Sequence, residues 1–167
     1  MTDSVVEIET ATAVGKPASL TVKTVSWNDP DAVALRNQQR IDIADRYERV
    51  DSEPGTPPSA DDITMFCVAY SGSKAVGCGG LRLLDHASAE IKRMFVLREA
   101  RGTGAAAAVL VYLEQHSKQL GLHRLLLETG DKLFDAIRFY TRSGYTRIPN
   151  FGYYQGVDTS ICMEKVL

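Results

Sequence analysis

The segment Arg101-Gly102-Thr103-Gly104-Ala105-Ala106 has the composition of an anion-binding loop. Residues 89–96 before it resemble a strand, and residues 107–114 after it resemble a helix. The first turn of a helix has N–H groups without intrahelical partners, and the helix dipole adds partial positive charge there. Glycine in the loop lets the oxygen atoms of a ligand approach the backbone. The segment therefore predicts a site for a phosphorylated ligand.

Two nucleotide-binding motifs can be compared with this loop. A kinase or ATPase P-loop requires Gly-Lys-Ser/Thr, and because Gly104 is followed by alanine, that motif is excluded. Gly102-x-Gly104-x-x-Ala107 does fit a dinucleotide-binding motif, and Glu128 ends the next expected strand, where a ribose-binding acid would lie. However, five residues separate the strand from the first glycine, and the strand carries charged side chains. A nicotinamide-binding oxidoreductase stays an alternative.

The elements that must position this loop follow from local patterns. Alternating apolar residues predict a strand near 19–27, and Asp29-Pro30 predicts the N-cap and first residue of a helix ending near 48. A Pro-rich loop, 52–59, follows. The expected strands 63–70, 75–83 and 88–96 are joined by short links, so they predict an antiparallel meander.

The pattern changes after the meander. A helix over 104–120 and a buried strand over 122–129 form one βαβ unit with the strand 88–96. A further helix, near 132–142, has Asp131 or Thr129 as its expected cap and Gly144 as its C′ glycine. Residues 159–167 look like a closing strand. The fold class is therefore α/β: a mixed sheet in one domain, 19–167, after a flexible leader, 1–18, with helices on both faces.

Composition restricts the class of protein further. The chain of 167 residues is 44% hydrophobic and 24% charged, which is ordinary for a globular domain. Its net charge of −2 and lack of a basic run argue against nucleic-acid or anionic-membrane partners. There is neither an 18-residue apolar run nor a signal sequence. Three well-separated cysteines without metal-ligand spacing predict reduced core thiols, no metal and a cytoplasmic location.

Two motifs on these elements together resemble a known family. Arg101-x-x-Gly104-x-Ala106 is similar to the pyrophosphate-binding signature of the GNAT superfamily, the acyl-CoA-dependent N-acetyltransferases. Residues 136–145, AIRFYTRSGY, resemble the family segment A-x-x-L-Y-x-x-x-G-F. The resemblance extends over residues 19–167 and implies a GNAT-type acyl-CoA N-acyltransferase fold. It also implies acetyl-CoA as acyl donor.

The resemblance implies roles for particular residues. Tyr140 matches the family tyrosine near the sulfur of CoA, which makes it the candidate general acid, and Glu90 matches a catalytic glutamate, the candidate base. Glu90 could equally be a charge on a solvated strand face. One departure is Leu133, which stands where many members have asparagine. The expected cofactor-binding residues are the strand end Met94, Phe95 and Val96 and the loop Arg101, Gly102, Thr103, Gly104, Ala105 and Ala106.

The acyl acceptor is defined less sharply. By family habit, it lies near the first helix with the loop that follows, 31–62, and near the segment before the last strand, 150–155. Aromatic side chains and charges of both signs there, among them Arg40 and Tyr47, favour a small polar or zwitterionic amine. Glu128 is a weaker candidate for holding a cationic group. We expect direct acetyl transfer in a ternary complex. We also expect a homodimer that forms through the C-terminal strands. A non-catalytic acyl-CoA-binding module is the second alternative to this enzyme.

Overall fold

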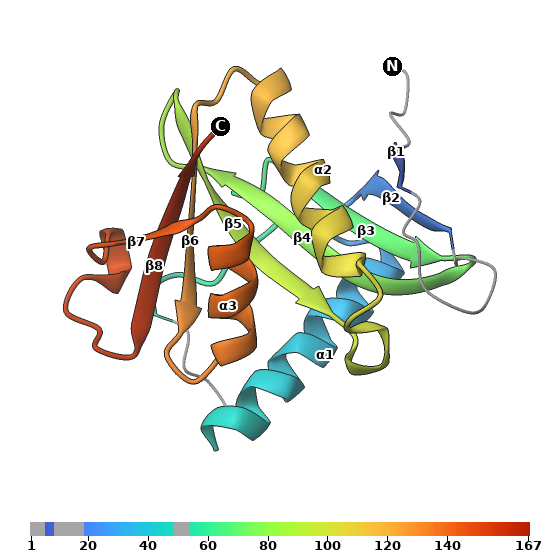
Figure 1. Ribbon diagram of the computed structural model, residues 1–167, viewed down its shortest axis with the longest axis horizontal. Helices are drawn as coiled ribbons and strands as arrows, with labels where there is room; N and C mark the ends of the chain where they lie inside the picture. Colours follow the sequence, from blue (N-terminus) through green and yellow to red (C-terminus); the bar gives the residue numbers. More distant parts are fainter. Residues whose placement is uncertain (1–5, 9–18, 49–53) are drawn as a thin grey trace.

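The computed structural model describes residues 6–8, 19–48 and 54–167. Its three α-helices are α1 (Pro30–Tyr47), α2 (Ala105–Gln119) and α3 (Phe134–Arg142), with 3-10 turns at Arg98–Ala100 and Gly152–Tyr154. The strands are β1 (Val6–Ile8), β2 (Leu20–Val25), β3 (Met65–Ser71), β4 (Lys74–Leu83), β5 (Ser88–Val96), β6 (Arg124–Gly130), β7 (Thr146–Ile148) and β8 (Ser160–Val166). Within the described residues these strands form one sheet, in the order β1-β2-β3-β4-β5-β6-β8-β7 (Figure 1).

The strand directions confirm the predicted mixed sheet. β2 to β5 form an antiparallel meander, because each pairs antiparallel with the next strand along the chain. β5 and β6 are parallel and are joined through α2, which confirms the βαβ unit. β8 lies antiparallel between β6 and β7. Two short strands were not anticipated: β7, and β1, which lies inside the predicted leader; the other residues of 1–18 lie outside the described part of the chain.

Two apolar layers cover the sheet. On β3, Cys67 and Ala69 pack in the larger core cluster with α2 and α3, whereas Phe66 and Val68 pack in a second cluster with α1. This alternation follows from the two-residue period of a strand, which turns successive side chains to opposite faces. Figure 1 accordingly shows α2 and α3 in front of the sheet, with α1 crossing its other face. The predicted arrangement of helices on both faces is confirmed.

Of the two predicted helix N-caps, that of α1 is confirmed and that of α3 is wrong. Asp29 Oδ1 accepts hydrogen bonds from the backbone N–H groups of Asp31 (2.9 Å) and Ala32 (3.3 Å), as predicted for the cap of α1. The predicted cap of α3 is wrong: its N-cap residue is Leu133, without a side-chain cap. Asp131 instead accepts a hydrogen bond from the Tyr47 hydroxyl at 3.1 Å. A tertiary contact thus replaces the local cap.

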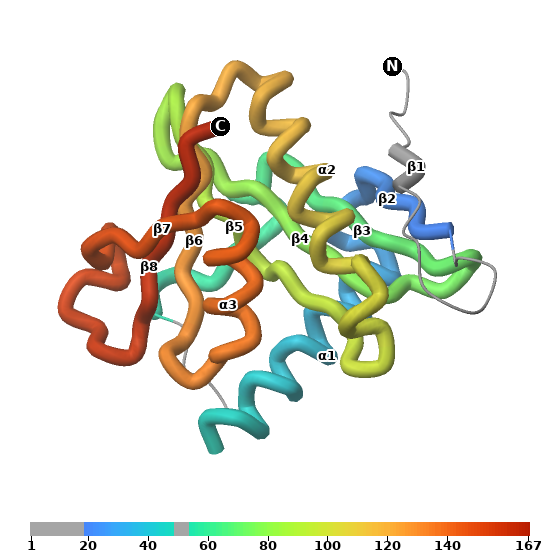
Figure 2. Tube along the Cα trace, viewed as in Figure 1, coloured from blue at the N-terminus to red at the C-terminus, as the bar shows by residue number. Residues whose placement is uncertain are grey.

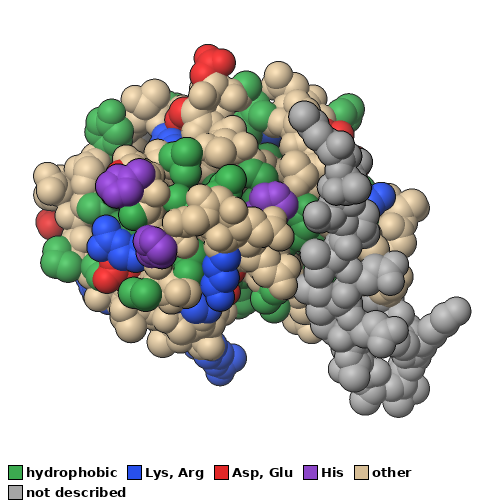
Figure 3. All heavy atoms as spheres, turned by 90° about the horizontal axis from the view of Figure 1, so that it is seen from above, with side chains coloured by type: hydrophobic (Ala, Val, Ile, Leu, Met, Phe, Trp, Pro, Cys, Tyr) green, Lys and Arg blue, Asp and Glu red, His purple; other side chains and the backbone are tan. Residues whose placement is uncertain are grey.

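Other expectations concern the interior and the surface. Cys67, Cys78 and Cys162 are buried free thiols, as predicted. Over the described ranges, no helix combines the length and hydrophobicity that a membrane span needs. On the face drawn in Figure 3, basic and acidic side chains are scattered among hydrophobic ones rather than gathered into one patch. That face therefore offers no broad basic surface for a polyanion.

Candidate active site

The sheet opens between its two parallel strands. β5 and β6 pair from Ser88↔Arg124 only as far as Ile91↔Leu127, although β5 continues to Val96 and β6 to Gly130. Figure 2 shows the two strands close together at their starts and apart at their ends. Strands that separate leave backbone groups without ladder partners, so the carboxyl ends of β5 and β6 present hydrogen-bonding groups to a ligand.

A bulge in β5 accompanies this separation. Gly80 pairs with Lys92 and Cys78 with Phe95, so β5 has one residue more than β4 in this interval. Arg93 takes up the irregularity with φ of 55°, which is a left-handed conformation that L-residues rarely adopt. The Cys78 thiol donates to the Arg93 carbonyl at 3.3 Å and helps to fix the bulge.

The end of β5 turns the backbone of Met94 and Val96 away from β4. The Leu97 N–H donates to the Val76 carbonyl of β4 at 2.9 Å, and successive amides of a strand point to opposite sides. The carbonyls confirm this direction: Met94 O accepts from Gln39 Nε2 at 3.0 Å, and Val96 O accepts from Arg101 Nε at 3.3 Å. The predicted residues Met94 and Val96 therefore face the opening, whereas Phe95 packs in the cluster under α1.

The predicted anion loop follows β5 after the 3-10 turn Arg98–Ala100. Gly104 is the N-cap of α2 with φ of 92°, and no side chain caps the helix. The first helical hydrogen bond runs from Ala108 N to Gly104 O, at 2.9 Å. The N–H groups of Ala105 and Ala106 therefore precede the ladder of the helix, as an anion site requires. The Thr103 hydroxyl donates to the Ala100 carbonyl at 2.6 Å.

The partly exposed Arg101 side chain pairs with α1. Its Nη2 lies 3.1 Å from Asp42 Oδ2 on α1, and Arg98 reaches Asp42 Oδ1 at 3.2 Å. Partial burial alone would raise the pKa of Asp42, but hydrogen bonds from the two arginines hold it below its usual value. α1 is thus tied to the loop by a carboxylate between two guanidinium groups.

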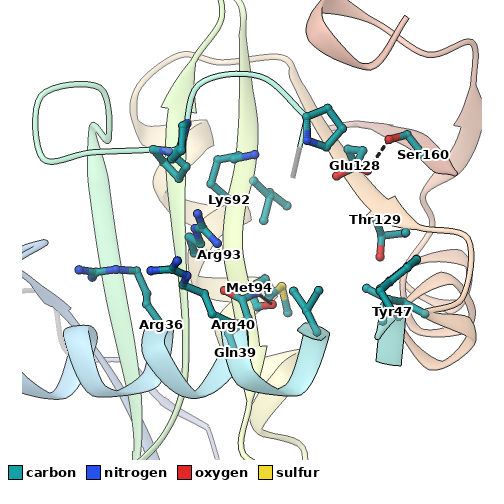
Figure 4. Close-up of a pocket in the computed structure, with 18 of the residues that line it drawn as sticks. Arg36, Gln39, Arg40, Tyr47, Lys92, Arg93, Met94, Glu128, Thr129 and Ser160 are labelled. Carbon is teal, nitrogen blue, oxygen red and sulfur yellow. Dashed lines mark hydrogen bonds between the residues drawn. The ribbon is translucent and has the colours of Figure 1, made fainter. Parts of the chain in front are cut away.

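A cavity of about 460 Å³ occupies the opening between the strands. It is bounded by α1, by the bulged part of β5, by the end of β6 and by the start of α3 (Figure 4). Met94 and Tyr140 line it, and so do Leu133 and Ala136 of the α3 segment. Of the residues predicted to contact the cofactor, Met94 is the one that reaches the cavity within the described residues; the anion loop lies beyond it.

Tyr140 lies at the wall of this cavity and is 7% exposed. Its ring packs edge-on against Phe139 and Tyr145, with centroids 5.3 and 5.6 Å apart. Its hydroxyl has no hydrogen bond to the part of the chain that the structure describes. Burial raises the pKa of Tyr140 above the usual value for a phenol, so the hydroxyl keeps its proton at neutral pH. A protonated hydroxyl at the cavity wall can donate to a ligand.

Glu90 lies in a buried polar network beside the cavity. Only 2% of it is exposed, and it is absent from the cavity lining. Arg82 Nη2 contacts its Oε2 at 3.0 Å, and the Tyr154 hydroxyl donates to Oε1 in a short hydrogen bond. Lys92 Nζ, which does line the cavity, lies 2.9 Å from the Tyr154 oxygen and 3.5 Å from Glu90 Oε1. The structure thus separates Glu90 from the cavity by Lys92 and Tyr154.

The acceptor side of the cavity carries residues that the sequence analysis anticipated only in part. Arg40, Tyr47 and the prolines 54, 57 and 58 line it, whereas residues 150–155 do not. Glu128 lines it too and accepts a hydrogen bond from the Ser160 hydroxyl at 2.7 Å. Sequence reasoning missed Arg36, Gln39 and Arg93. The helical spacing of 36, 39 and 40 puts these residues on one face of α1, but nothing local indicates that this face meets β5.

Comparison with known proteins agrees with the geometry. Residues 26–145 match the sequence model of the acetyltransferase (GNAT) family. The chain is 36% identical over 103 residues to an IAA acetyltransferase of Azospirillum brasilense, covering 61% of this chain and 67% of that protein. It is 32% identical over 90 residues to an aminoalkylphosphonate N-acetyltransferase of Salmonella typhimurium, covering 51% and 58%.

Structural comparison points the same way. A Klebsiella pneumoniae protein described as an acyl-CoA N-acyltransferase superposes with a TM-score of 0.75 at 29% identity, covering 89% of this chain and 97% of that one. The antiparallel partner of β5 also contradicts the dinucleotide-binding alternative, in which the first βαβ unit opens a parallel sheet. The predicted fold, enzyme class and acyl donor are confirmed at the level of the family. The chain belongs to the GNAT family of acetyltransferases, enzymes that use acetyl-CoA as acyl donor.

Proposed function

We propose that this protein transfers an acetyl group directly from acetyl-CoA to the primary amine of a small polar molecule or peptide, with both substrates bound together. One observation carries the proposal: the opening between β5 and β6 has a protonated phenol at its wall and an uncapped helix start beyond its end. The Salmonella relative, named for an aminoalkylphosphonate, supports a small amine as acceptor.

The residues after β5 fit the donor. The N–H groups at the start of α2 suit a pyrophosphate, because they combine unpaired donors with the positive end of the helix dipole. The backbone of Met94 and Val96 suits an extended amide-containing arm, which can continue the interrupted ladder of β5. When bound, acetyl-CoA supplies the activated acetyl thioester. The Val96 N–H, directed into the opening, would stabilise negative charge on the carbonyl oxygen.

Tyr140 would supply the proton for the departing sulfur. As the bond between the amine nitrogen and the acetyl carbon forms, the carbon–sulfur bond breaks, and the Tyr140 hydroxyl donates to the sulfur. Burial makes a phenol a weaker acid, but the same apolar surroundings, including Leu133 and Ala136, also disfavour a thiolate. Proton transfer between two groups that share one environment is therefore less unfavourable than the phenol pKa alone implies.

We propose Glu90 as the final acceptor of the amine proton, which must reach it through another side chain. Glu90 does not line the cavity, so the proton must cross Lys92 or Tyr154, which lie between. Glu90→Gln keeps the size of the side chain and removes the negative charge. If Glu90 accepts the proton, this variant should lower kcat while the affinity for acetyl-CoA is kept; an unchanged kcat would assign the proton to water.

The function is tested by binding and turnover on the same protein. A rise in melting temperature with acetyl-CoA measures donor binding, and release of free thiol with a panel of amines measures transfer. Thiol release that depends on an amine and falls in Tyr140→Phe supports the enzyme. Donor binding with no thiol release from any amine would instead favour a non-catalytic acyl-CoA-binding module.

A further inference from the structure

The charge of the cavity is opposite to that of the chain. The protein carries 19 basic and 21 acidic residues, for a net charge of −2. Among the described residues, however, four basic side chains and one carboxylate, Glu128, line the cavity; the four are Arg36, Arg40, Lys92 and Arg93. Gathering like charges at one site is unfavourable unless a negative charge offsets them. The cavity is thus biased towards an anion.

Contacts within the protein hold Arg36 and Lys92. The Arg36 guanidinium stacks 3.6 Å from the centroid of the Trp27 ring and donates to the Trp27 carbonyl at 2.7 Å. Lys92 is held in the network with Tyr154 and Glu90. These contacts hold both side chains at the border of the cavity, and the Glu90 carboxylate offsets the charge of Lys92.

Arg40 differs from them. It lines the cavity and is exposed, and within residues 6–8, 19–48 and 54–167 it has neither a hydrogen bond nor an ion pair. Arg93, at the bulge of β5, lines the same cavity as Arg40 of α1 (Figure 4). Burial is the main cause of the lowered pKa of Arg36, and the positive charge of Arg93 lowers it further.

Gln39, between the two arginines of α1, gives an independent sign of a ligand. It is 9% exposed and its Nε2 donates to the Met94 carbonyl, so the amide orientation is set and Oε1 is left as an acceptor. Oε1 is buried and has no hydrogen-bond partner in the described residues. Buried acceptors are normally satisfied, so an N–H group from a ligand in this cavity is expected here. A neutral amine about to attack the thioester has such a group.

We propose that the acceptor is an amine that also carries an anionic group, a carboxylate, sulfonate or phosphonate, which binds Arg40 and Arg93 while its N–H donates to Gln39 Oε1. This inference rests on the proposed function, since it names the substrate class of the same site. Guanidinium groups bind such oxyanions through paired, charge-assisted hydrogen bonds. Gln39, Arg40 and Arg93 line one cavity of about 460 Å³, so a small molecule that carries both the amine and the anion fits it, as in short amino acids and aminoalkyl phosphonates or sulfonates.

The test compares matched amines. β-Alanine, taurine and 2-aminoethylphosphonate carry an anion two carbons from the nitrogen, and ethanolamine is their neutral counterpart. With acetyl-CoA, the anionic amines should have a kcat/KM at least about tenfold above that of ethanolamine. Arg40→Gln should remove most of this difference, with the KM of acetyl-CoA unchanged. Arg142→Gln, at an exposed arginine of α3 outside the cavity lining, is the control.

A binding measurement separates the two proposals. The same amines are titrated by calorimetry into the protein saturated with CoA, where no transfer occurs. Anionic amines that bind through Arg40 but are not acetylated would support the anion site and refute the proposed transfer to them. Equal affinity and equal turnover for ethanolamine, or equal losses in Arg40→Gln for both kinds of amine, would overturn the inference and leave the acetyltransferase intact.

Discussion

Tyr140→Phe should separate chemistry from folding. The Tyr140 hydroxyl has no hydrogen bond within the described residues, and its ring contacts with Phe139 and Tyr145 remain in phenylalanine. The free energy of unfolding should therefore change by less than about 1 kcal/mol. General acid catalysis contributes about 10²-fold to 10⁴-fold, so kcat should fall by about 100-fold or more, equivalent to about 2.7 kcal/mol in the barrier. The acetyl-CoA affinity should change little.

Tyr145→Phe provides the matched control. Tyr145 is as buried as Tyr140, but it is absent from the cavity lining and its hydroxyl donates to Glu114 at 3.2 Å. Removing this bond should cost about 1 kcal/mol of stability, because Lys165 still contacts the Glu114 carboxylate at 2.9 Å. The turnover of the folded protein should be unchanged.

The assay combines urea unfolding with thiol release, measured at saturating acetyl-CoA and amine. In the wild type, the raised pKa of Tyr140 should also keep kcat free of any alkaline decline from this phenol below about pH 10. A Tyr140→Phe enzyme with wild-type kcat would refute the role of general acid. A large loss of stability in the same variant would show that the hydroxyl has a structural partner instead.

Two further predictions concern the loop and the buried thiols. Gly104→Glu should abolish acetyl-CoA binding, measured by thermal shift, because it puts negative charge at the start of α2. Gly121→Glu is the control. Gly121 also has a positive φ (75°) but lies at the far end of α2, so this variant should bear a similar backbone strain and still bind acetyl-CoA. Stability should fall above about pH 8.5, because burial raises the pKa of Cys78 to about 12 and only the unfolded thiol ionises in between. Between about pH 9 and pH 11, the free energy of unfolding, measured in urea, should fall by about 1.4 kcal/mol per pH unit less in Cys78→Ala than in the wild type. Equal falls in the two proteins would contradict the raised pKa of Cys78.

The parts of the fold that sequence reasoning predicted depend on residues close together in the chain. Asp29 and Pro30 start α1 because an N-cap acts on N–H groups two and three residues away. Gly104 begins α2 and Gly144 follows α3, each with the positive φ (92° and 90°) that glycine permits. The order of strands follows from short links and from the right-handed βαβ crossover. These features need no knowledge of distant contacts.

The features that sequence reasoning did not predict depend on contacts between residues far apart in the chain. Gln39 meets Met94 across 55 positions, and the Tyr154 hydroxyl reaches Glu90 across 64. Asp131 would be a good helix cap locally, but Tyr47, 84 positions away, takes its carboxylate. The same tertiary contacts decide whether a charged residue such as Glu90 faces a cavity or a buried network, which no alternation of residue types reveals.

The bulge of β5 links both halves of the site. By adding one residue opposite Gly79, it ends regular pairing just where the backbone of Met94 and Val96 turns to the opening, and it directs Arg93 into the acceptor side. A Cβ at Gly79 would lie 3.0 Å from the Leu113 and Val109 side chains, so glycine there helps α2 to pack closely over the bulge. A positive φ at Arg93 costs about 1–2 kcal/mol. A single irregularity therefore prepares the strand for the donor and supplies a cation for the acceptor, which explains how one short segment can position two substrates against each other.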